Sequence, residues 1–348
     1  MSTLVTIVIA LLVFGFLIFV HEFGHYIFAR IFKVKINEFS IGMGPKLLWY
    51  DSKKTGIRYA LSMFPIGGYV AMEGENEEAQ DPNSFDKKPA WQRLIITVAG
   101  AGVNILVGVI LISILVTMRP LGSTTISQFA DTEKAGYDVS SADSGLMVGD
   151  RIVEIEGKSV AIYSELSYEI ARRGIRPLDF VVIRNGERIT VKDVVFPGDE
   201  IDGEKFALID FGTTLVKKDF GSVAKYSFRL SFLTVRMCWE AIYDLFTGRF
   251  SLNAVSGPVG ISNEIGNAAR EGIASLLHIA GLISINLGFM NLLPIPALDG
   301  GRLITTLGEI VTRKRIPKKV EGMINTVGLI ALLLLSAVIL VKDVIKLI

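Results

Sequence analysis

The chain has 348 residues, of which half are hydrophobic and a fifth are charged, and its mean hydropathy is positive. This composition excludes an ordinary soluble domain and indicates an integral membrane protein. A net charge of +1 argues against a nucleic-acid partner, and the single cysteine, Cys238, excludes an intrachain disulfide framework and a multi-cysteine zinc site.

The first apolar segment, residues 1–30, contains the sequence HEFGH from His21 to His25. Because it has no basic n-region and no small-residue cleavage site, we predict a retained transmembrane helix rather than a secretory signal. On that helix His21 and His25 project from one face, so their imidazoles can share one metal ion. Glu22 lies beside the first histidine, where its carboxylate can take a proton from a water molecule, as in the HExxH metalloproteases.

The same residues have a purely structural explanation, which is a pair of hydrogen-bonded core histidines. However, the chain has three histidines in all, and two of them lie in this pentapeptide. A glutamate within a membrane-length helix also costs on the order of 2.5 kcal/mol or more, so such groups usually mark a functional site. The metal-site interpretation is therefore favoured.

A basic edge that includes Arg30 and Lys33 follows the first helix, which predicts that residues 31–93 lie on the cytoplasmic side. Short β-like runs between residues 36 and 72 leave no room there for a spanning helix. Because irregular backbone near a membrane has to be buried or to line a cavity, we predict a membrane-associated β-hairpin or small sheet beside the metal site, with an ordinary loop as the alternative. The acidic run GENEEAQD, residues 74–81, predicts a solvated surface.

Residues 94–118 are apolar over the length of a second transmembrane helix. Gly100 and Asn104 are four residues apart on it; a small residue permits close helix approach, and an asparagine at membrane depth needs a partner. Both features suit packing against the HEFGH helix, although simple helix packing explains them equally well.

Residues 119–215 are charged, punctuated by glycine and rich in β-branched side chains. The sequence GLMVGDRIVEIEGKSV is followed by a helix-like segment and then by a hairpin with Asn185 and Gly186 at its turn. This order resembles a PDZ domain, and the length accommodates one copy. The resemblance implies an extracytoplasmic domain that either binds a newly exposed C-terminus or excludes substrates with bulky outer domains.

The remainder of the chain alternates between interfacial and spanning segments. Charged residues at helical spacing predict that residues 216–272 form an amphipathic interfacial helix and a linker. Residues 273–311 are predicted to form a third transmembrane segment, which Pro294 and Pro296 must break. Residues 312–348 comprise a basic cytoplasmic loop and a fourth transmembrane helix.

Catalytic zinc generally takes three protein ligands and leaves one position open. Asp299 is the best candidate for the third ligand, because it follows the break in the third segment and reaches about the depth of His25. His278 is a rival, but it lies near the outer end of its helix and is better explained as an interfacial or hydrogen-bonded residue. Glu309 is a weaker rival, better explained as a cytoplasmic surface group.

These motifs together resemble the site-2 protease family of intramembrane zinc metalloproteases, in the branch of the bacterial regulator-of-sigma-E protease. The resemblance rests on HEFGH in the first span, GAGVN in the second, the PDZ-like insertion and NLLPIPALDGG in the third, and it covers essentially the whole chain. A single PDZ-like domain is a departure from the best-known Gram-negative members, which carry two.

The resemblance implies that His21, His25 and Asp299 bind one Zn²⁺ ion and that Glu22 is the catalytic base. It also implies that the active site is shaped by Asn291, Pro294 and Pro296. We expect four further residues to shape the site or to contact substrate, namely Asn104, Gly67, Gly68 and Tyr69.

The predicted fold is a polytopic α-helical membrane protein with about four transmembrane helices, a membrane-associated β-hairpin or sheet and an inserted α+β PDZ-like domain. The predicted activity is hydrolysis of peptide bonds within transmembrane segments, with residues 57–72 pairing with the unwound substrate as an added strand. The resemblance implies a bacterial plasma (inner) membrane location, with the N-terminus outside and the active site near the cytoplasmic leaflet. It further implies regulated intramembrane proteolysis of anti-sigma-factor-like proteins or remnant signal peptides, pre-cut by a separate site-1 protease. A catalytically idle PDZ-containing scaffold and a metal transporter are the alternatives.

Overall fold

The computed structural model describes residues 3–347 except 76, 133, 135–136, 174–175, 202–203 and 250–254. The chain divides into two compact units, each with its own interior. Unit 1 comprises residues 1–111 and 255–348, and unit 2 comprises residues 112–254.

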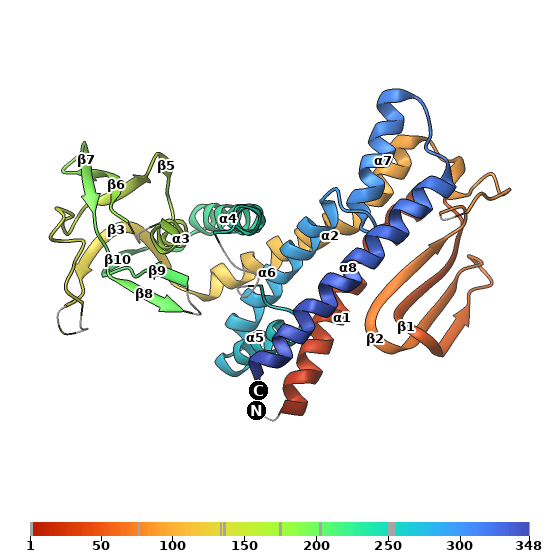
Figure 1. Ribbon diagram of the computed structural model, residues 1–348, viewed down its shortest axis with the longest axis horizontal. Coiled ribbons are helices and arrows are strands. Elements are labelled where there is room, and N and C mark those ends of the chain that lie inside the picture. The colour runs from red at the N-terminus through yellow and green to blue at the C-terminus, as the bar shows by residue number, and fades with distance from the viewer. Residues whose placement is uncertain are drawn as a thin grey trace. The chain divides into compact units, whose positions relative to one another are not determined.

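Among the described residues, four helices are long and apolar enough to cross a membrane, which confirms the prediction of about four. They are α1 (Thr3–Ile31), α2 (Ala90–Met118), α6 (Ile273–Leu292) and α8 (Lys318–Leu347). Two shorter helices complete the helical part of unit 1, α5 (Pro258–Glu271) and α7 (Asp299–Thr312), as Figure 1 shows. The six-residue break between α6 and α7 contains Pro294 and Pro296, as the sequence predicts.

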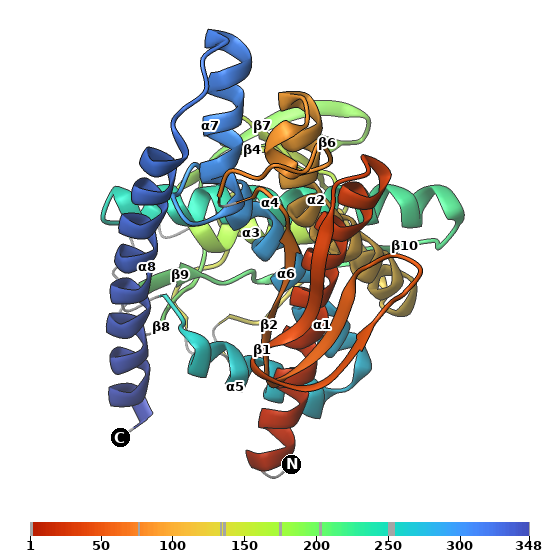
Figure 2. The same cartoon turned by 90° about the vertical axis from the view of Figure 1, so that its right-hand side faces the viewer.

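Glycines set the close approaches between these helices. A Cβ on Gly24 of α1 would lie 2.5 Å from the carbonyl oxygen of Ala99 in α2, and one on Gly288 of α6 would lie 2.6 Å from that of Ala101. Backbones this close to each other are typical of helices that associate within a membrane. Helix α5 lies between the N-terminal end of α1 and the C-terminal end of α8 (Figure 2), where the Asp343 carboxylate accepts hydrogen bonds from the Gly257 and Gly260 amides at the start of α5.

Two long, bent strands form the sheet of unit 1, β1 (Ile36–Asp51) and β2 (Arg58–Met72). The first part of β1 pairs with both ends of β2, because Glu38 is opposite Ala71 on one side and Arg58 on the other. The second part of β1 pairs again with the start of β2, from Lys46 opposite Ser62 to Asp51 opposite Arg58. The segment 68–72 therefore forms one edge of the sheet, and the segment 46–51 forms the other.

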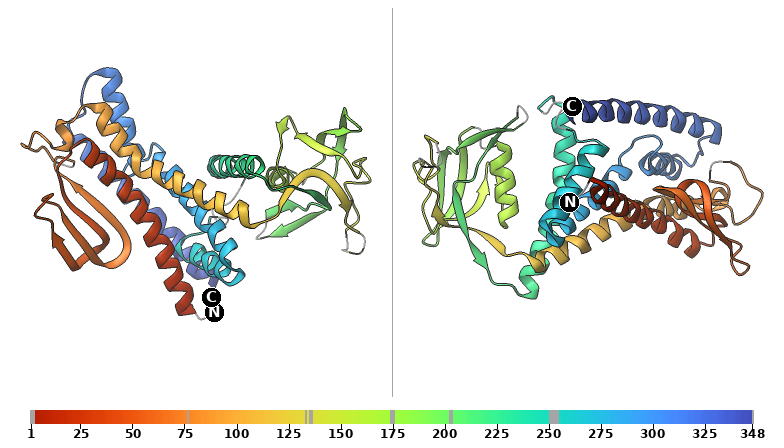
Figure 3. Two further views of the ribbon diagram at one scale, coloured as in Figure 1. Left: turned by 180° about the vertical axis from the view of Figure 1, so that it is seen from behind. Right: turned by 90° about the horizontal axis from the view of Figure 1, so that it is seen from below.

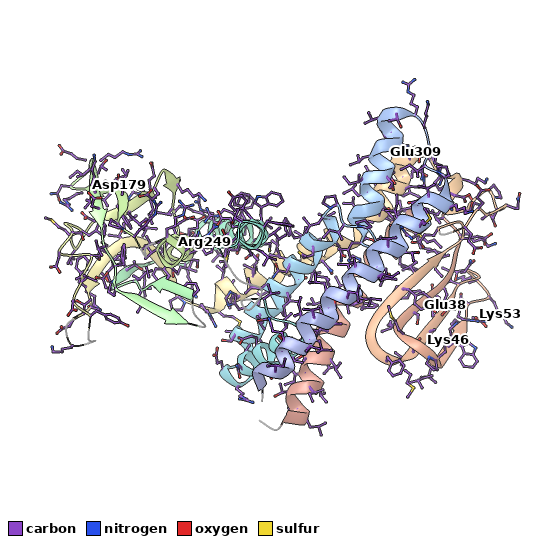
Figure 4. All side chains as sticks on the ribbon, viewed as in Figure 1. Glu38, Lys46, Lys53, Asp179, Arg249 and Glu309 are labelled. Atoms are coloured by element: carbon purple, nitrogen blue, oxygen red, sulfur yellow. The ribbon has the colours of Figure 1, made fainter. Side chains whose placement is uncertain are left out.

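The sheet is attached to the helices by an apolar core around Phe39 and Val70, which also contains Ala29 of α1, Ile96 of α2 and Phe85. Phe85 belongs to the short 3₁₀ helix η1 (Phe85–Lys87) that precedes α2. On the polar side of the sheet, Glu38 and Lys46 lie together on β1 (Figure 4), 2.5 Å apart, and the Tyr69 hydroxyl donates a hydrogen bond of 2.6 Å to Glu38. This core holds the 68–72 edge against α1.

In the described part of unit 2, six strands form one sheet with the order β10-β3-β4-β6-β7 and with β5 paired to β4. A second, two-stranded sheet joins β8 and β9, and α3 covers one face of the larger sheet, visible in yellow-green in Figure 3. Asn185 and Gly186 both have positive φ at the turn between β6 and β7, as expected of a tight hairpin. The bounds are β3 (Leu121–Phe129), β4 (Arg151–Ile155), β5 (Lys158–Ser159), α3 (Tyr163–Arg173), β6 (Leu178–Arg184), β7 (Glu187–Val194), β8 (Gly198–Ile201), β9 (Glu204–Ala207) and β10 (Phe211–Val216).

The last element of unit 2 is the amphipathic helix α4 (Phe220–Phe246), which begins with a capping box between Asp219 and Ser222. Charged residues of α4 form ion pairs with α3 and with Lys158 of β5 within the same unit. Arg172 of α3 contacts both Glu240 and Asp244, and Lys158 lies 2.8 Å from Glu240. Burial opposes ionisation of Glu240, but hydrogen bonds from Lys158 and Tyr168 and the charge of Arg172 outweigh it and lower the pKa of the Glu240 carboxyl to about 2.

Candidate metal centre

Three side chains from two helices meet at one point in unit 1. The Nε2 atoms of His21 and His25 lie 3.2 Å apart, and the Asp299 Oδ2 atom lies 3.1 Å from the first and 3.2 Å from the second. His21 and His25 come from successive turns of α1, as the HEFGH spacing predicts, and Asp299 is the first residue of α7. Among the described residues, these three form the group of histidine and acidic side chains able to hold a metal ion.

The surroundings orient each imidazole. The His25 Nδ1 atom lies 2.8 Å from the carbonyl oxygen of Ile96, which requires a proton on Nδ1 and leaves the lone pair on Nε2. The His21 Nδ1 atom lies 3.4 Å from the Asn104 amide, whose Oδ1 atom is buried and has no hydrogen-bond partner. If the amide turns by 180°, Oδ1 accepts from His21 Nδ1–H, and the Nε2 lone pair of His21 is then on the side that faces Asp299, as it is in His25.

Gly100 makes room for both rings. A Cβ at this position would lie 2.4 Å from His25 Nε2 and 2.9 Å from His21 Cε1, whereas a Cβ on Gly102 would have no heavy atom within 4 Å. The two glycines of GAGVN therefore differ in role, since Gly100 faces the imidazoles closely and Gly102 does not.

Asp299 is held by the tight loop that precedes α7. A Cβ on Gly300 would lie 1.7 Å from the Leu293 carbonyl oxygen, so the loop closes back on itself at this residue. Ala297 has a φ of 72°, in the left-handed region, and its amide donates a hydrogen bond of 3.3 Å to Asn325 Oδ1 in α8. Pro296 packs against α8 at Gly328, where a Cβ would be 2.4 Å from the proline Cβ. The loop is thus fixed both internally and by α8.

Beside the three ligand candidates is a cavity of about 410 Å³. Glu22 lines it next to His21 and His25, and the Glu22 Cγ atom lies 3.4 Å from the position that a Gly68 Cβ would occupy. The other lining residues are Tyr69, Val70, Ala71, Met72, Glu75, Phe85, Ile96, Thr97, Asp299 and Arg302. A carboxylate and the three ligand candidates therefore share one cavity.

The edge of the sheet forms one wall of this cavity. Tyr69, Val70, Ala71 and Met72 all line it, although successive side chains of a strand point to opposite faces. Four consecutive residues can border one space only if the backbone edge of the strand faces it. The segment 68–72 pairs with β1 on its other side, so its outer edge is turned toward the cavity.

The donor set fits zinc. With bonds of about 2.0–2.1 Å, a tetrahedral zinc ion separates its ligand atoms by about 3.3–3.4 Å, close to the 3.1–3.2 Å between the three atoms here. Asp299 Oδ2 is buried, and neither imidazole makes a hydrogen bond to it, although both nitrogens are close. With Asn104 turned as above, two nitrogen lone pairs and a carboxylate oxygen are directed at a common point, and they repel one another unless a cation lies between them.

The structure brings only some of the other predicted site residues to the cavity. Tyr69 lines it, and Gly68 and Asn104 contact Glu22 and His21, respectively. Gly67, with a φ of 91°, packs against Met43 instead. Within the described residues, Asn291, Pro294 and Pro296 are outside the cavity lining. Glu309, the weaker rival for the third ligand position, pairs with Arg93 at 2.6 Å instead (Figure 4 labels Glu309).

Two charged lining residues were not predicted as site residues, Arg302 and Glu75. Arg302 follows Asp299 by three residues on α7, and this spacing places both on one helix face, which is a signal that the sequence contains. Glu75 lies in the acidic run that predicted a solvated surface. That prediction holds for the exposed Glu77 and Glu78 and is wrong for Glu75, because Arg302 binds it inside the cavity.

Comparison with known proteins agrees with this geometry. The model of peptidase family M50 matches residues 9–335. A candidate zinc metalloprotease of Clostridium acetobutylicum is 34% identical over 97% of both chains, and one of Fusobacterium nucleatum is 37% identical over 98% of this chain and 99% of the relative. The zinc metalloprotease RasP of Geobacillus kaustophilus is 28% identical over 99% of both.

The chain therefore belongs to peptidase family M50, the site-2 protease family. It is a membrane protein and a zinc metalloprotease.

Proposed function

We propose that this protein is an intramembrane zinc metalloprotease that cleaves peptide bonds within transmembrane segments of other membrane proteins. In this proposal His21, His25 and Asp299 hold one zinc ion and Glu22 is the catalytic base. The observation that carries it is the convergence of three ligand atoms within 3.2 Å of one another, beside a glutamate, in a unit built from membrane-length helices.

Each residue of the site has a distinct task in hydrolysis. Glu22 takes a proton from the attacking water and passes it to the leaving amine, as a general base and then a general acid. His25 keeps its Nε2 lone pair available because Nδ1 donates to the Ile96 carbonyl, and His21 does the same when the Asn104 amide turns its Oδ1 toward Nδ1. Zinc, when bound, supplies a Lewis acid that polarises the scissile carbonyl and lowers the pKa of the attacking water.

A substrate helix has to unwind before its carbonyls can be attacked. We propose that the outer edge of residues 68–72 receives the unwound segment as an added strand and replaces its lost hydrogen bonds. The edge lines the cavity next to Glu22, which supports this assignment. Arg58, in the other half of the predicted 57–72 segment, is unsuitable because β1 pairs with it on both sides, at Glu38 and at Asp51.

Proline at Tyr69 places a residue without a backbone N–H in the segment whose outer edge is assigned to the substrate. We expect Tyr69→Pro to reduce cleavage at least tenfold while zinc content is retained. Tyr50→Pro, at the opposite edge of the same sheet, is the matched control and should cleave normally. Equal cleavage by both variants would refute strand addition.

The exposed apolar surface of the sheet supports its association with the membrane. Seven large apolar side chains on its outer segments are between 50% and 67% exposed, which is unusual for a water-soluble sheet. The apolar face of α4 likewise supports an interfacial helix, since its charged residues bond to unit 2 and its aromatic residues remain exposed. These residues are Met43, Leu47, Leu48, Trp49, Tyr50, Met63 and Phe64 in the sheet, and Phe228, Phe232, Trp239, Tyr243 and Phe246 in α4.

For the setting of the reaction, we propose the bacterial plasma membrane, with the N-terminus outside and the active site near the cytoplasmic leaflet. The basic segments after α1 and between α7 and α8 support this orientation. We propose that unit 2 contains a PDZ-like domain that restricts access to substrates already cut by a site-1 protease, such as anti-sigma-factor-like proteins or remnant signal peptides. Deleting residues 121–213 should then allow uncut substrates to be processed, and unchanged selectivity would argue against the filter.

The decisive experiment is cleavage of a transmembrane substrate by the purified protein in proteoliposomes, with zinc content measured in parallel. We expect one zinc ion per chain, loss of cleavage on chelation, and loss of cleavage with retained zinc in Glu22→Gln. Cleavage that is unaffected by Glu22→Gln would refute the assignment of the base. Absence of cleavage by the wild type together with zinc flux across the vesicle would instead favour a transporter, and absence of both would favour an idle scaffold.

A further inference from the structure

A second cavity, of about 500 Å³, adjoins the catalytic cavity in unit 1. It differs in that polar side chains of α8 line it, among them Lys318, Glu321 and Asn325. The two cavities share three lining residues, Glu75, Asp299 and Arg302. The boundary between the outer, polar cavity and the catalytic cavity is therefore made by these residues.

Two of these three residues form an ion pair. Arg302 Nη1 donates to Glu75 Oε1, joining α7 to the segment that follows the sheet. Both side chains are mostly buried, with exposed fractions of 27% for Arg302 and 16% for Glu75. Because Arg302 lies one helical turn after Asp299, the pair is located directly beside the ligand candidates.

The backbone around Glu75 is fixed from several directions, so the pair has a rigid partner on that side. We call residues 73–75 and 77–88 the strap. The Lys35 ammonium lies 2.7 Å from Glu73 and 3.0 Å from Asp81, and the Lys318 ammonium donates to the carbonyl oxygens of Gly74 and Glu77 at 2.5 and 2.7 Å. Gly74 itself has a φ of 75°, and a Cβ there would lie 2.2 Å from Asp86 Oδ1.

Hydrolysis consumes one water molecule per bond cleaved, and a site among membrane-length helices needs a route for it. Continuous contact with solvent would, however, weaken the electrostatic interactions within the site. An ion pair between two side chains can separate by rotamer change alone, without moving the fixed strap or α7.

We propose that the Arg302–Glu75 ion pair is a gate that controls passage of water and hydrated metal ions between the outer cavity and the catalytic cavity. In this role Arg302 holds the Glu75 side chain in place and does not itself contact the substrate. This inference rests on the proposed zinc site and assigns its solvent-side entrance.

Metal exchange tests the gate without requiring proteolysis. A gate changes the rates at which zinc enters and leaves by the same factor, and it leaves the dissociation constant unchanged, because the free and bound states are the same. Damage to the site instead changes the dissociation constant. The measurements are the rate of zinc release to excess EDTA, the rate of zinc uptake by the metal-free protein, and the equilibrium affinity for zinc.

Two double variants keep the net charge of the wild type. Arg302→Gln with Glu75→Gln removes the ion pair, and Arg302→Glu with Glu75→Arg reverses it. We expect the first to accelerate release and uptake about tenfold each with an affinity within threefold of the wild type. The reversed pair should return both rates to within threefold of the wild type.

The control is Arg93→Gln with Glu309→Gln, which removes an ion pair of 2.6 Å that also joins α7 to a neighbouring element but lines neither cavity. Its exchange rates should match the wild type. Unchanged rates in the neutral Arg302 and Glu75 variant, failure of the reversed pair to restore them, or a tenfold loss of affinity would each overturn the gate. Absence of stoichiometric zinc in the wild type would refute the proposed metal site itself, so the two failures are distinguishable.

Discussion

Substitution of Gly100 by alanine is the sharpest test of how α2 supports the proposed zinc site. The added Cβ would lie 2.4 Å from His25 Nε2, which is 1.0 Å short of the 3.4 Å at which ordinary contact begins. It would also lie 2.9 Å from His21 Cε1, so neither ring can move aside without disturbing the other. Metal–ligand distances tolerate deviations of only about 0.2 Å, so relief of the clash must displace at least one ligand.

Overpacking of this kind costs about 1–3 kcal/mol. If the strain falls on the site, zinc affinity decreases by a factor of about 5 to 150. The assay is zinc binding by the purified protein in competition with a chelator of known affinity, together with thermal stability of the metal-free form. Gly102→Ala is the matched control, since it lies two residues away on α2 with open space around it. If Gly100→Ala bound zinc as tightly as Gly102→Ala, the close approach of α2 to the imidazoles would be refuted.

Two further predictions concern other parts of the chain. Gly300→Ala would place a Cβ 1.7 Å from the Leu293 carbonyl oxygen, so we expect this variant to lose stoichiometric zinc. Gly308→Ala on the same helix has open space around it and should retain zinc. Equal zinc content in the two variants would contradict the tight loop. The pKa of Glu240 is lower in the folded protein than the unfolded-state value of about 4.3. Its ion pairs should therefore stabilise the contact between α3 and α4 fully when the pH is above about 4.3, and this contribution should be lost as the pH falls toward about 2. Hydrogen exchange in α3, corrected for intrinsic rates, should therefore increase at acid pH in the wild type and should depend less on pH in Glu240→Gln.

The regular parts of this protein were predictable because their signals are local. Long apolar runs specify spanning helices, and the two prolines between α6 and α7 specify the break that places Asp299 at a helix start. The amphipathic character of α4 was equally visible. What its charged residues contact was not, since periodicity shows that a face is polar but not whether water or α3 covers it.

The acidic segment after the sheet shows the same limitation at the candidate site. Composition alone favours solvent for every carboxylate in GENEEAQD, and Glu77 and Glu78 are indeed exposed. Glu75 differs because Arg302, 227 residues away in sequence, supplies a cation inside the cavity. No pattern within the segment distinguishes it from its neighbours.

The amino-acid sequence by itself indicated the candidate ligands and the candidate base, because helix periodicity places His21 and His25 on one face, and its membrane-length runs predicted four helices long enough to span. Only the tertiary structure decided that Gly100 admits both imidazoles, that residues 68–72 turn their edge to the cavity, and that Arg302 meets Glu75. These features depend on distances between segments remote in the chain, and such distances follow from the packing of whole elements rather than from any local preference.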